Sequence, residues 1–193
     1  MIEKIFTQSA IYIIYLNNII GQGVDGTVYS SIYASNKNTF INNVKIATKI
    51  INKNIIEDID NFIKIHKISS NYFGPCIYDI VTKEEKIYIF MELMDIGLND
   101  WIVKSHLEQK SWKDIKNYIR NVVLPIHLKM KNKRITVGDK NVNNYMFKNN
   151  TLKRIDFTMS VAKEKLNYQE IKSYGYINVI NPFTKKMEKI LLT

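Results

Sequence analysis

The sequence is poor in cysteine, proline and histidine, with one, three and three residues respectively in a chain of 193. The single Cys76 excludes an internal disulfide framework and a zinc site built from cysteines. The longest apolar run, residues 11–16, is far shorter than the roughly 18 residues of a membrane-spanning helix, and no small-residue cleavage site follows it. We therefore expect neither a membrane anchor nor a signal peptide, and a protein that works in the reducing cytoplasm without a membrane partner.

Arginine is also scarce, so lysine carries nearly all of the formal net charge of +10. The arginines are Arg120, Arg134 and Arg154, while lysines gather in residues 129–140 and 163–189. Such clusters attract acidic proteins or phosphate backbones. A solvated surface is the simpler explanation of the clusters. An acidic protein is the partner that they fit, and nucleic acid is not favoured because no aromatic-interleaved binding module accompanies them.

Two aspartates and one asparagine form the most informative polar pattern. Asn144 follows Asp139 by five residues, and Asp156 comes after a short predicted hairpin. Magnesium-dependent phosphoryl transfer uses such groups, because one carboxylate orients the attacking hydroxyl while an amide oxygen and a second carboxylate hold the metal. Alone, this spacing more often caps a loop than catalyses, so the assignment depends on a nucleotide-binding half elsewhere in the chain.

A cluster of glycines is the first candidate for that half. Residues 9–20 are β-branched and aromatic, which predicts a strand, and the glycines of residues 21–26 follow directly. Glycine lets backbone amides approach phosphates closely because it has no Cβ. A dinucleotide-binding loop would open a helix and place an acid about 20 residues on, but residues 27–36 are strand-like and no acid occurs between Asp25 and Glu57. An ordinary hairpin turn is the remaining alternative.

Residues 44–51 predict a further strand, and this strand carries Lys49. A lysine among apolar neighbours can reach into a cleft, although a surface lysine on an edge strand fits the pattern too. Residues 54–69 repeat apolar side chains at helical spacing. Glu57, Asp58 and Asp60 would lie in the first turn of this helix, where the helix dipole favours acids.

Two strands and then helices are predicted after that. Residues 76–81 and 86–92 are strand-like, and helical spacing begins at Leu98. Ser111 predicts the N-cap of a long helix, which we expect Pro125 to kink or shift. His127 on that helix is expected to be structural.

Taken in order, these motifs resemble those of protein kinases. The glycine cluster resembles the glycine-rich loop, residues 46–49 resemble the Val-Ala-Ile-Lys strand, and residues 139–144 with Asp156 resemble the catalytic loop and the Asp-Phe-Gly segment. The resemblance covers roughly residues 12–160.

The chain departs from the kinase signature in three places. Val137 and Gly138 stand where His-Arg is usual, Lys140 and Asn141 stand where Leu-Lys is usual, and Thr158 replaces the glycine.

The resemblance implies an α+β, bilobal kinase-like fold in a single domain of residues 1–193. The small lobe, residues 1–94, would be an antiparallel sheet plus one helix, and the large lobe, residues 95–193, would be mainly helical. The segment after Asp156 cannot accommodate the activation segment, Ala-Pro-Glu motif and further helices of the family. We therefore expect a truncated large lobe, which an acidic protein partner would complete.

The resemblance also assigns roles to residues. Asp139 and Lys49 would be catalytic, the first orienting the hydroxyl of a protein substrate and the second contacting the phosphates of ATP. Asn144 and Asp156 would bind Mg²⁺. The nucleotide-binding residues would be Ile20, Gly21, Gln22, Gly23, Gly26, Val28, Lys49, Glu92 and Met94, with Met91 at the back of the pocket. The acid that pairs with Lys49 stays open between Glu57, the first choice, and Asp58 and Asp60.

The implied activity is transfer of phosphate from ATP to Ser or Thr hydroxyls of proteins. A kinase-like binding module without catalysis is one alternative, motivated by Asn141 and Thr158, and a kinase of small molecules is another. Ile, Asn and Lys, all encoded by A/T-rich codons, dominate the chain. This usage indicates an A/T-rich genome such as that of a large DNA virus or a parasite, and for a virus the compartment would be the host cytoplasm.

Overall fold

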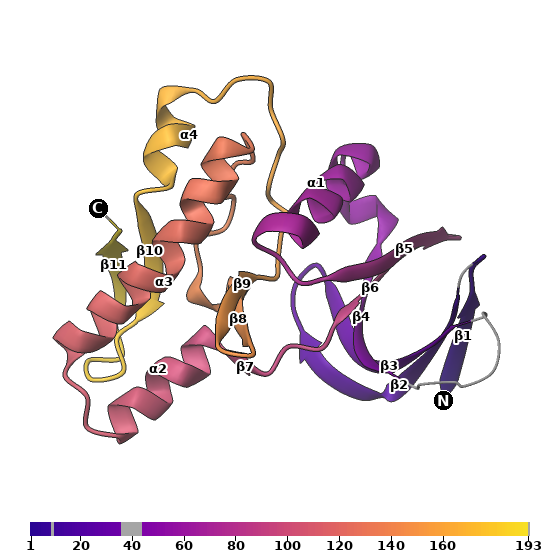
Figure 1. The fold of residues 1–193 in the computed structure, drawn as a ribbon, viewed down its shortest axis with the longest axis horizontal. Helices are drawn as coiled ribbons and strands as arrows, with labels where there is room; N and C mark the ends of the chain where they lie inside the picture. The colour runs from indigo at the N-terminus through magenta and orange to yellow at the C-terminus, as the bar shows by residue number, and fades with distance from the viewer. Residues whose placement is uncertain (9, 36–43, 193) are drawn as a thin grey trace. The chain divides into compact units, whose positions relative to one another are not determined.

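The computed structural model describes residues 1–8, 10–35 and 44–192. Ser9, which begins the first predicted strand, and Asn36, which ends the next strand-like run, lie outside the described residues. The chain divides into two compact units (Figure 1). Unit 1 comprises residues 1–59 and 76–93, and unit 2 comprises residues 60–75 and 94–193. The predicted lobe boundary at residue 94 stays a prediction.

Unit 1 is an antiparallel sheet with the strand order β1-β2-β3-β4-β6-β5. The strands are β1 (Ile2–Phe6), β2 (Ala10–Gln22), β3 (Gly26–Ser35), β4 (Val44–Asn52), β5 (Ile77–Lys83) and β6 (Lys86–Glu92). Strands β2 to β6 lie where the β-branched and aromatic runs predict strands. Strand β1 was not predicted, and it pairs with β2 from Ile2↔Tyr15 to Phe6↔Ile11.

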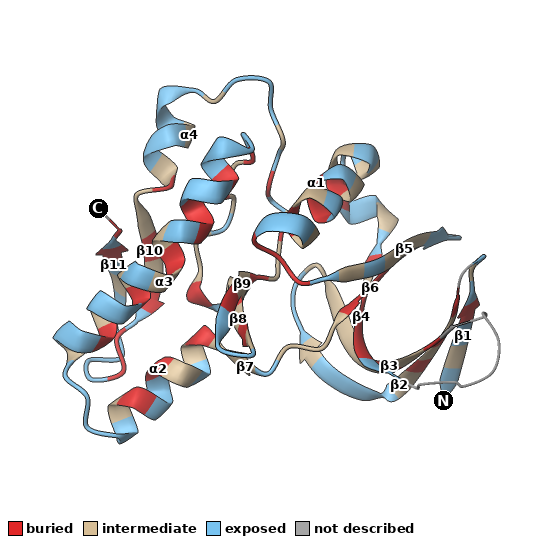
Figure 2. Cartoon of the chain, in the orientation of Figure 1, coloured by how far each residue is buried: buried red, intermediate tan, exposed pale blue. Residues whose placement is uncertain are grey.

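One face of this sheet carries the hydrophobic core of unit 1 (Figure 2). The buried members are Ile5, Ala10, Tyr12, Ile14, Ile46, Tyr88 and Phe90. The rings of Tyr12 and Phe90 stack at 3.7 Å between centroids. Because side chains alternate along a strand, Lys49 lies on the face of β4 opposite to that of Ile46.

Unit 2 packs its core around one long helix, α3. Its elements are α1 (Ile59–Tyr72), β7 (Ile96–Gly97), α2 (Leu98–Leu107), α3 (Trp112–Asn132), the 3₁₀ turn η2 (Val142–Asn144), β8 (Tyr145–Lys148), β9 (Thr151–Arg154), α4 (Tyr168–Ser173), β10 (Tyr176–Ile180) and β11 (Met187–Leu191). Ser111 caps α3, since its side chain accepts a hydrogen bond from the Asp114 backbone N–H at 3.2 Å. The helix runs without interruption through Pro125, which therefore does not divide it.

Helix α1 begins later than the sequence suggests. Residues 53–55 form a 3₁₀ turn, and the α-helix starts at Ile59. Asp60 lies in the first turn as predicted, but Glu57 and Asp58 precede the helix, so their placement in that turn was wrong. Aspartate is favoured at an N-cap, where its side chain can accept from the free N–H groups of the first turn, and the late start after Asp58 agrees with this preference.

A hairpin formed by β10 and β11 follows Asp156 and α4, and the sequence analysis did not predict it. The two strands pair antiparallel from Tyr176↔Leu191 to Ile180↔Met187. Ile177 is fully buried in the core of unit 2. The hairpin also adjoins the segment after Asp139, since the Asn178 N–H donates to the Lys140 carbonyl at 2.9 Å.

The named strands pair antiparallel and occur together with helices, and the predicted α+β class is confirmed. In the described part of the chain, no helix is both long and apolar enough to span a membrane.

Candidate active site

The predicted glycine-rich loop is the hairpin between β2 and β3. The Gly23 N–H donates to the Gly26 carbonyl at 3.0 Å and closes the turn, and Val24 at its tip is fully exposed. A Cβ at Gly26 would lie 2.3 Å from the carbonyl oxygen of Ile50 on β4. Glycine is therefore required at residue 26 by the close approach of two strands.

Lys49 lies in the same cross-strand row as the base of this hairpin. Gly21 pairs with Val28, and Val28 pairs with Lys49. Paired residues of neighbouring strands lie side by side on one face. Lys49 is only 8% exposed. Three of the predicted nucleotide-binding residues thus share one face of the unit 1 sheet, opposite its hydrophobic core.

The predicted adenine-binding segment follows β6. Met91 pairs with Ala47, which places it on the same face as Lys49. Glu92 makes two hydrogen bonds with Cys76. Its N–H donates to the Cys76 carbonyl at 2.9 Å, and its Oε1 accepts from the Cys76 N–H at 2.6 Å. An adenine contact of the Glu92 backbone would therefore use its carbonyl oxygen. Met94 begins the second segment of unit 2.

In unit 2, the side chains of Asp139 and Asn144 are in direct contact. The amide Nδ2 of Asn144 donates to Asp139 Oδ2 at 2.9 Å and to the Asp139 carbonyl at 3.3 Å. The other carboxylate oxygen, Oδ1, accepts from the Asn141 N–H at 3.0 Å. These hydrogen bonds hold the carboxylate of Asp139 in one orientation. Because Asp139 is exposed, the carboxylate remains accessible from solvent.

Asp156 is brought beside this pair by the backbone. The N–H of Ile155, the residue before it, donates to the Asn144 carbonyl at 2.9 Å. Oδ1 of Asp156 accepts two hydrogen bonds from Thr158, one from the N–H at 3.0 Å and one from the hydroxyl at 2.8 Å. The threonine that replaces the motif glycine therefore orients the carboxylate of Asp156.

A family model for protein tyrosine and serine/threonine kinases matches residues 14–180. The chain belongs to this kinase family. The match confirms the kinase-like fold predicted from the motifs, and it places the chain among phosphoryl transferases that act on proteins. The family covers both tyrosine and serine/threonine kinases. No curated protein matches the sequence.

The donor set of unit 2 fits the magnesium ion that kinases use. Mg²⁺ prefers one or two carboxylates, with waters and substrate phosphates completing its shell. The amide oxygen of Asn144 accepts no hydrogen bond from the described residues, so it can face a cation. No cluster of three or more His, Cys, Asp or Glu occurs in the described ranges. Asn144 and Asp156 would thus hold Mg²⁺ together with phosphate oxygens.

The departures at the catalytic loop have structural explanations. Gly138 has φ +63°, and a Cβ there would lie 2.5 Å from the Met159 carbonyl oxygen, so the arginine that is usual in kinases has no room. Asn141 caps the η2 turn, because its Oδ1 accepts from the Asn143 N–H at 3.0 Å. Lys140 lies 5.2 Å over the ring of Tyr176, and its side chain is engaged there.

Sequence reasoning missed the hydrogen bonds that support the carboxylates. Thr158 binds Asp156, and Arg154 is 1% exposed and donates to the carbonyls of Asp139 and Asp156. The signal available for Arg154 was composition, since an arginine is rare in a chain that otherwise uses lysine. No such signal pointed to Thr158.

His127 is structural in this kinase, as expected. It is fully buried, with Nδ1 2.8 Å from the Tyr174 carbonyl and Nε2 2.6 Å from the Tyr145 hydroxyl. Burial lowers the pKa of His127 to about 4; the hydrogen bond to Tyr174 opposes this shift, and the charge of Arg154 adds to it.

Acidification is expected to destabilise the kinase through His127. Its pKa is about 4 when folded and ~6.5 when unfolded, so the unfolded state takes up the proton first as the pH falls. Between pH 7 and pH 5 this difference should remove about 2 kcal/mol from the free energy of unfolding. Urea unfolding of the wild type and of His127→Gln at both pH values measures it. An equal pH dependence in the two proteins would contradict the assignment.

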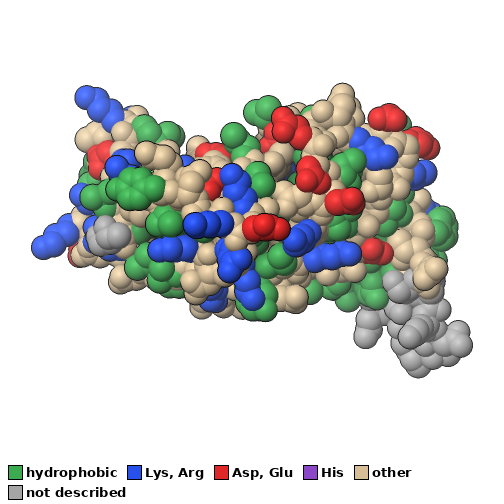
Figure 3. Space-filling model, turned by 90° about the horizontal axis from the view of Figure 1, so that it is seen from above, with side chains coloured by type: hydrophobic (Ala, Val, Ile, Leu, Met, Phe, Trp, Pro, Cys, Tyr) green, Lys and Arg blue, Asp and Glu red, His purple; other side chains and the backbone are tan. Residues whose placement is uncertain are grey.

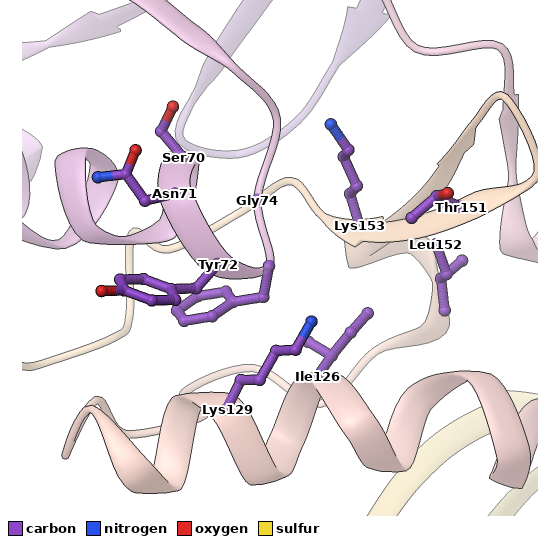
Figure 4. Close-up of a pocket in the computed structure, with 10 residues that line it drawn as sticks. Ser70, Asn71, Tyr72, Gly74, Ile126, Lys129, Thr151, Leu152 and Lys153 are labelled. Carbon is purple, nitrogen blue, oxygen red and sulfur yellow. The ribbon is translucent and has the colours of Figure 1, made fainter.

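A cavity of about 190 Å³ lies elsewhere in unit 2 (Figure 4). It is lined by the end of α1, one side of α3 and strand β9, through Ser70, Asn71, Tyr72, Phe73, Gly74, Ile126, Lys129, Thr151, Leu152 and Lys153. None of these residues corresponds to a catalytic or nucleotide-binding position of the kinase signature. The cavity is therefore not the candidate active site.

The predicted lysine clusters are partly engaged with aromatic rings. Lys133 lies 3.8 Å over the ring of Tyr72, and Lys189 lies 3.7 Å over that of Tyr176. On the face shown in Figure 3, lysine and arginine side chains are interspersed with acidic ones. That face does not present an unbroken basic surface, and the acidic partner stays a prediction.

Proposed function

We propose that this kinase transfers the γ-phosphoryl group of ATP, bound with Mg²⁺, to Ser or Thr hydroxyls of proteins. The observation that supports this most is the joined group of Asp139, Asn144 and Asp156 in unit 2. Its members are linked by the contact of Asn144 with Asp139 and by the bond from the Ile155 N–H to Asn144. A family member that had lost catalysis would have no chemical need of two oriented carboxylates and an amide beside them.

Each residue of this group has one proposed role. Asp139 Oδ2 or Oδ1 accepts the hydrogen bond of the substrate hydroxyl and orients it toward the phosphorus atom. Asn144 and Asp156 would hold Mg²⁺, which would supply positive charge beside the phosphate oxygens. Because two N–H groups and the Thr158 hydroxyl already fix the two carboxylates, little reorganisation is needed during the reaction.

The phosphates of the nucleotide are proposed to bind unit 1. The amides of the Gly21 to Gly26 hairpin would cover the phosphates, and Val28 would pack on the base. Lys49 would contact the phosphates, and its place in the same cross-strand row as Val28 and Gly21 at the base of the hairpin supports this role. The Glu92 carbonyl and the Met94 backbone would meet adenine.

Replacing Lys49 with Met is expected to lower kcat/KM for a protein substrate by at least ~100-fold, the size of effect seen when one stabilising charge is removed from a transition state. Lys45→Met is the matched control, because Lys45 is an exposed lysine of the same strand, and it should behave as wild type. Labelled phosphate incorporation into Ser, Thr and Tyr peptides measures both variants. Equal incorporation by Lys49→Met and wild type would refute the role of Lys49, and incorporation only into Tyr would refute the Ser/Thr assignment.

Asn141 and Thr158 favour a second candidate, a kinase-like module that binds nucleotide without turnover. The lysine that usually steadies the transferred phosphate is absent, since Asn141 occupies its position. Thermal unfolding with magnesium-ATP separates the two functions: ligand at ~100 times its dissociation constant stabilises a binder by about 2.7 kcal/mol. A thermal shift without phosphate transfer would identify the module. Transfer to a sugar or aminoglycoside but to no protein would identify a small-molecule kinase.

A further inference from the structure

We propose that Arg154 is a positioning residue that holds the catalytic and metal-binding segments in register, in place of the side chains missing at residues 137 and 138. The inference rests on the proposed function. Arg154 touches no reacting atom in this scheme. It acts through the backbone of Asp139 and Asp156.

The guanidinium of Arg154 is buried and donates hydrogen bonds in three directions. Nε donates to the Asp156 carbonyl at 3.0 Å, and Nη2 donates to the Asp139 carbonyl at 2.9 Å and to the Val137 carbonyl. Nη1 donates to the Tyr145 hydroxyl at 3.0 Å. One rigid, planar group thus connects the residue that is proposed to orient the substrate with the residue that is proposed to bind the metal.

The network behind Arg154 fixes the guanidinium itself. Arginine only donates, so the Tyr145 oxygen accepts from Arg154 and its single proton is directed to His127 Nε2, 2.6 Å away. His127 Nε2 therefore accepts, and Nδ1 carries the proton that it donates to the Tyr174 carbonyl at 2.8 Å. The series of hydrogen bonds thus runs from Arg154 through Tyr145 and His127 to the Tyr174 carbonyl, and the phenol of Tyr145 is wholly buried. The guanidinium is consequently held by packed groups and not by solvent.

The sequence around Asp139 explains why this cation comes from β9. Val137 and Gly138 carry no polar side chain, and the Met159 carbonyl leaves no space for one at residue 138. The Val137 carbonyl otherwise accepts only a long bond from the Ser160 hydroxyl, at 3.4 Å, and the Asp139 carbonyl one from Asn144 Nδ2, at 3.3 Å. Shorter bonds to both carbonyls come from Arg154. Arg154, two residues before Asp156, supplies these bonds from the strand that leads into the metal-binding segment.

Lysine cannot perform the same task. Its ammonium is a point charge, whereas the guanidinium is a planar fork with donors in fixed directions. The carbonyls of Asp139 and Asp156 are bound by different nitrogens of Arg154, which one ammonium could not reproduce at the same distances. Arg154→Lys therefore keeps the positive charge but loses the separate donors that bind the carbonyls of Asp139 and Asp156.

The test compares Arg154→Lys with wild type, using two kinds of measurement. We expect kcat to fall by at least ~10-fold while KM for the peptide is unchanged, because misplacement of reacting groups lowers the rate more than binding. We also expect the amide protons of Asn141 and Thr158, which bind the two carboxylates, to exchange at least ~10-fold faster than the change in global stability accounts for. Arg120→Lys is the control: Arg120 is a half-buried arginine of α3 whose guanidinium donates to the Leu191 carbonyl and to Asn117. It does not contact the carbonyls of Asp139 or Asp156, so kcat and the exchange of the two amides should match wild type.

Tyr145→Phe provides a second, milder variant, since it removes one acceptor of Arg154 and keeps the aromatic packing. It should show the same pattern at a smaller size. The proposal is overturned if kcat and both exchange rates of Arg154→Lys equal those of wild type, or if they change only as far as global unfolding does. Wild-type protein that transfers no phosphate would refute the proposed function alone, because the exchange of the two amides tests the positioning role without catalysis.

Discussion

Asp156→Asn is expected to reduce phosphate transfer by at least ~1,000-fold, the largest effect among single changes. The substitution removes the negative charge from the proposed Mg²⁺ ligand. Asparagine has nearly the same shape, and its amide oxygen can still accept the two hydrogen bonds from Thr158, so the fold should be retained. Developing charge on the phosphate oxygens would then lack its counter-ion. Transfer of labelled phosphate at saturating magnesium-ATP measures the loss.

Glu108→Gln is the control for this experiment. It removes an exposed carboxylate of unit 2 that pairs with Lys110 at 3.0 Å on the surface, and such pairs contribute little. Transfer by the control should equal that of wild type. If Asp156→Asn also labels substrate as well as wild type, the metal assignment of Asp156 is wrong.

Gly138→Ala is expected to destabilise unit 2 by roughly 2–4 kcal/mol, a size that is typical of strain combined with a steric clash. Gly138 has φ +63°, where a side chain is strained, and a Cβ would lie 2.5 Å from the Met159 carbonyl oxygen. Relief of the clash must move the backbone beside Asp139, so transfer should also fall. Urea unfolding and phosphate transfer measure the two effects.

Gly175→Ala is the matched control for Gly138→Ala. A Cβ at Gly175 would meet its nearest atom, the Lys172 carbonyl oxygen, at 3.4 Å, so this change should alter the free energy of unfolding by less than about 1 kcal/mol. Restoring the motif arginine with Gly138→Arg should harm the protein more than Gly138→Ala does. Wild-type stability and activity of Gly138→Ala would show that the loop adopts another conformation.

Strands β2 to β6 of unit 1 were predictable because their β-branched and aromatic runs are long and are separated by turn residues. The hairpin of β10 and β11 was not, since β11 (Met187–Leu191) alternates weakly and two of its five residues are charged. Its strand conformation depends on packing in the core of unit 2, where Ile190 is 2% exposed. Local pattern cannot encode such a tertiary cause. The late start of α1 after Asp58 agrees with the preference of aspartate for an N-cap, which the apolar spacing does not reveal.

The candidate site shows a similar division. The spacing drew attention to Asp139, Asn144 and Asp156, and the resemblance to kinases assigned their roles. The structure joins them through hydrogen bonds within unit 2. The assignment of Lys49 and the glycine hairpin to the same nucleotide stays a prediction. Arg154 could not be recognised, because its partners are backbone carbonyls whose positions depend on the folded loop and not on residue types.

The hydrogen bond between Asn178 and Lys140 connects the hairpin of β10 and β11 to the segment that follows Asp139. The Asn178 N–H donates to the carbonyl of the residue that follows Asp139, and the ring of Tyr176 receives the ammonium of Lys140 from the same strand. A molecule that binds β10 and β11 and shifts them would therefore displace the backbone next to Asp139, which is proposed to orient the acceptor hydroxyl. Such a molecule would lower turnover without occupying the proposed nucleotide-binding residues of unit 1, which makes this hairpin a candidate target for an inhibitor that does not compete with ATP.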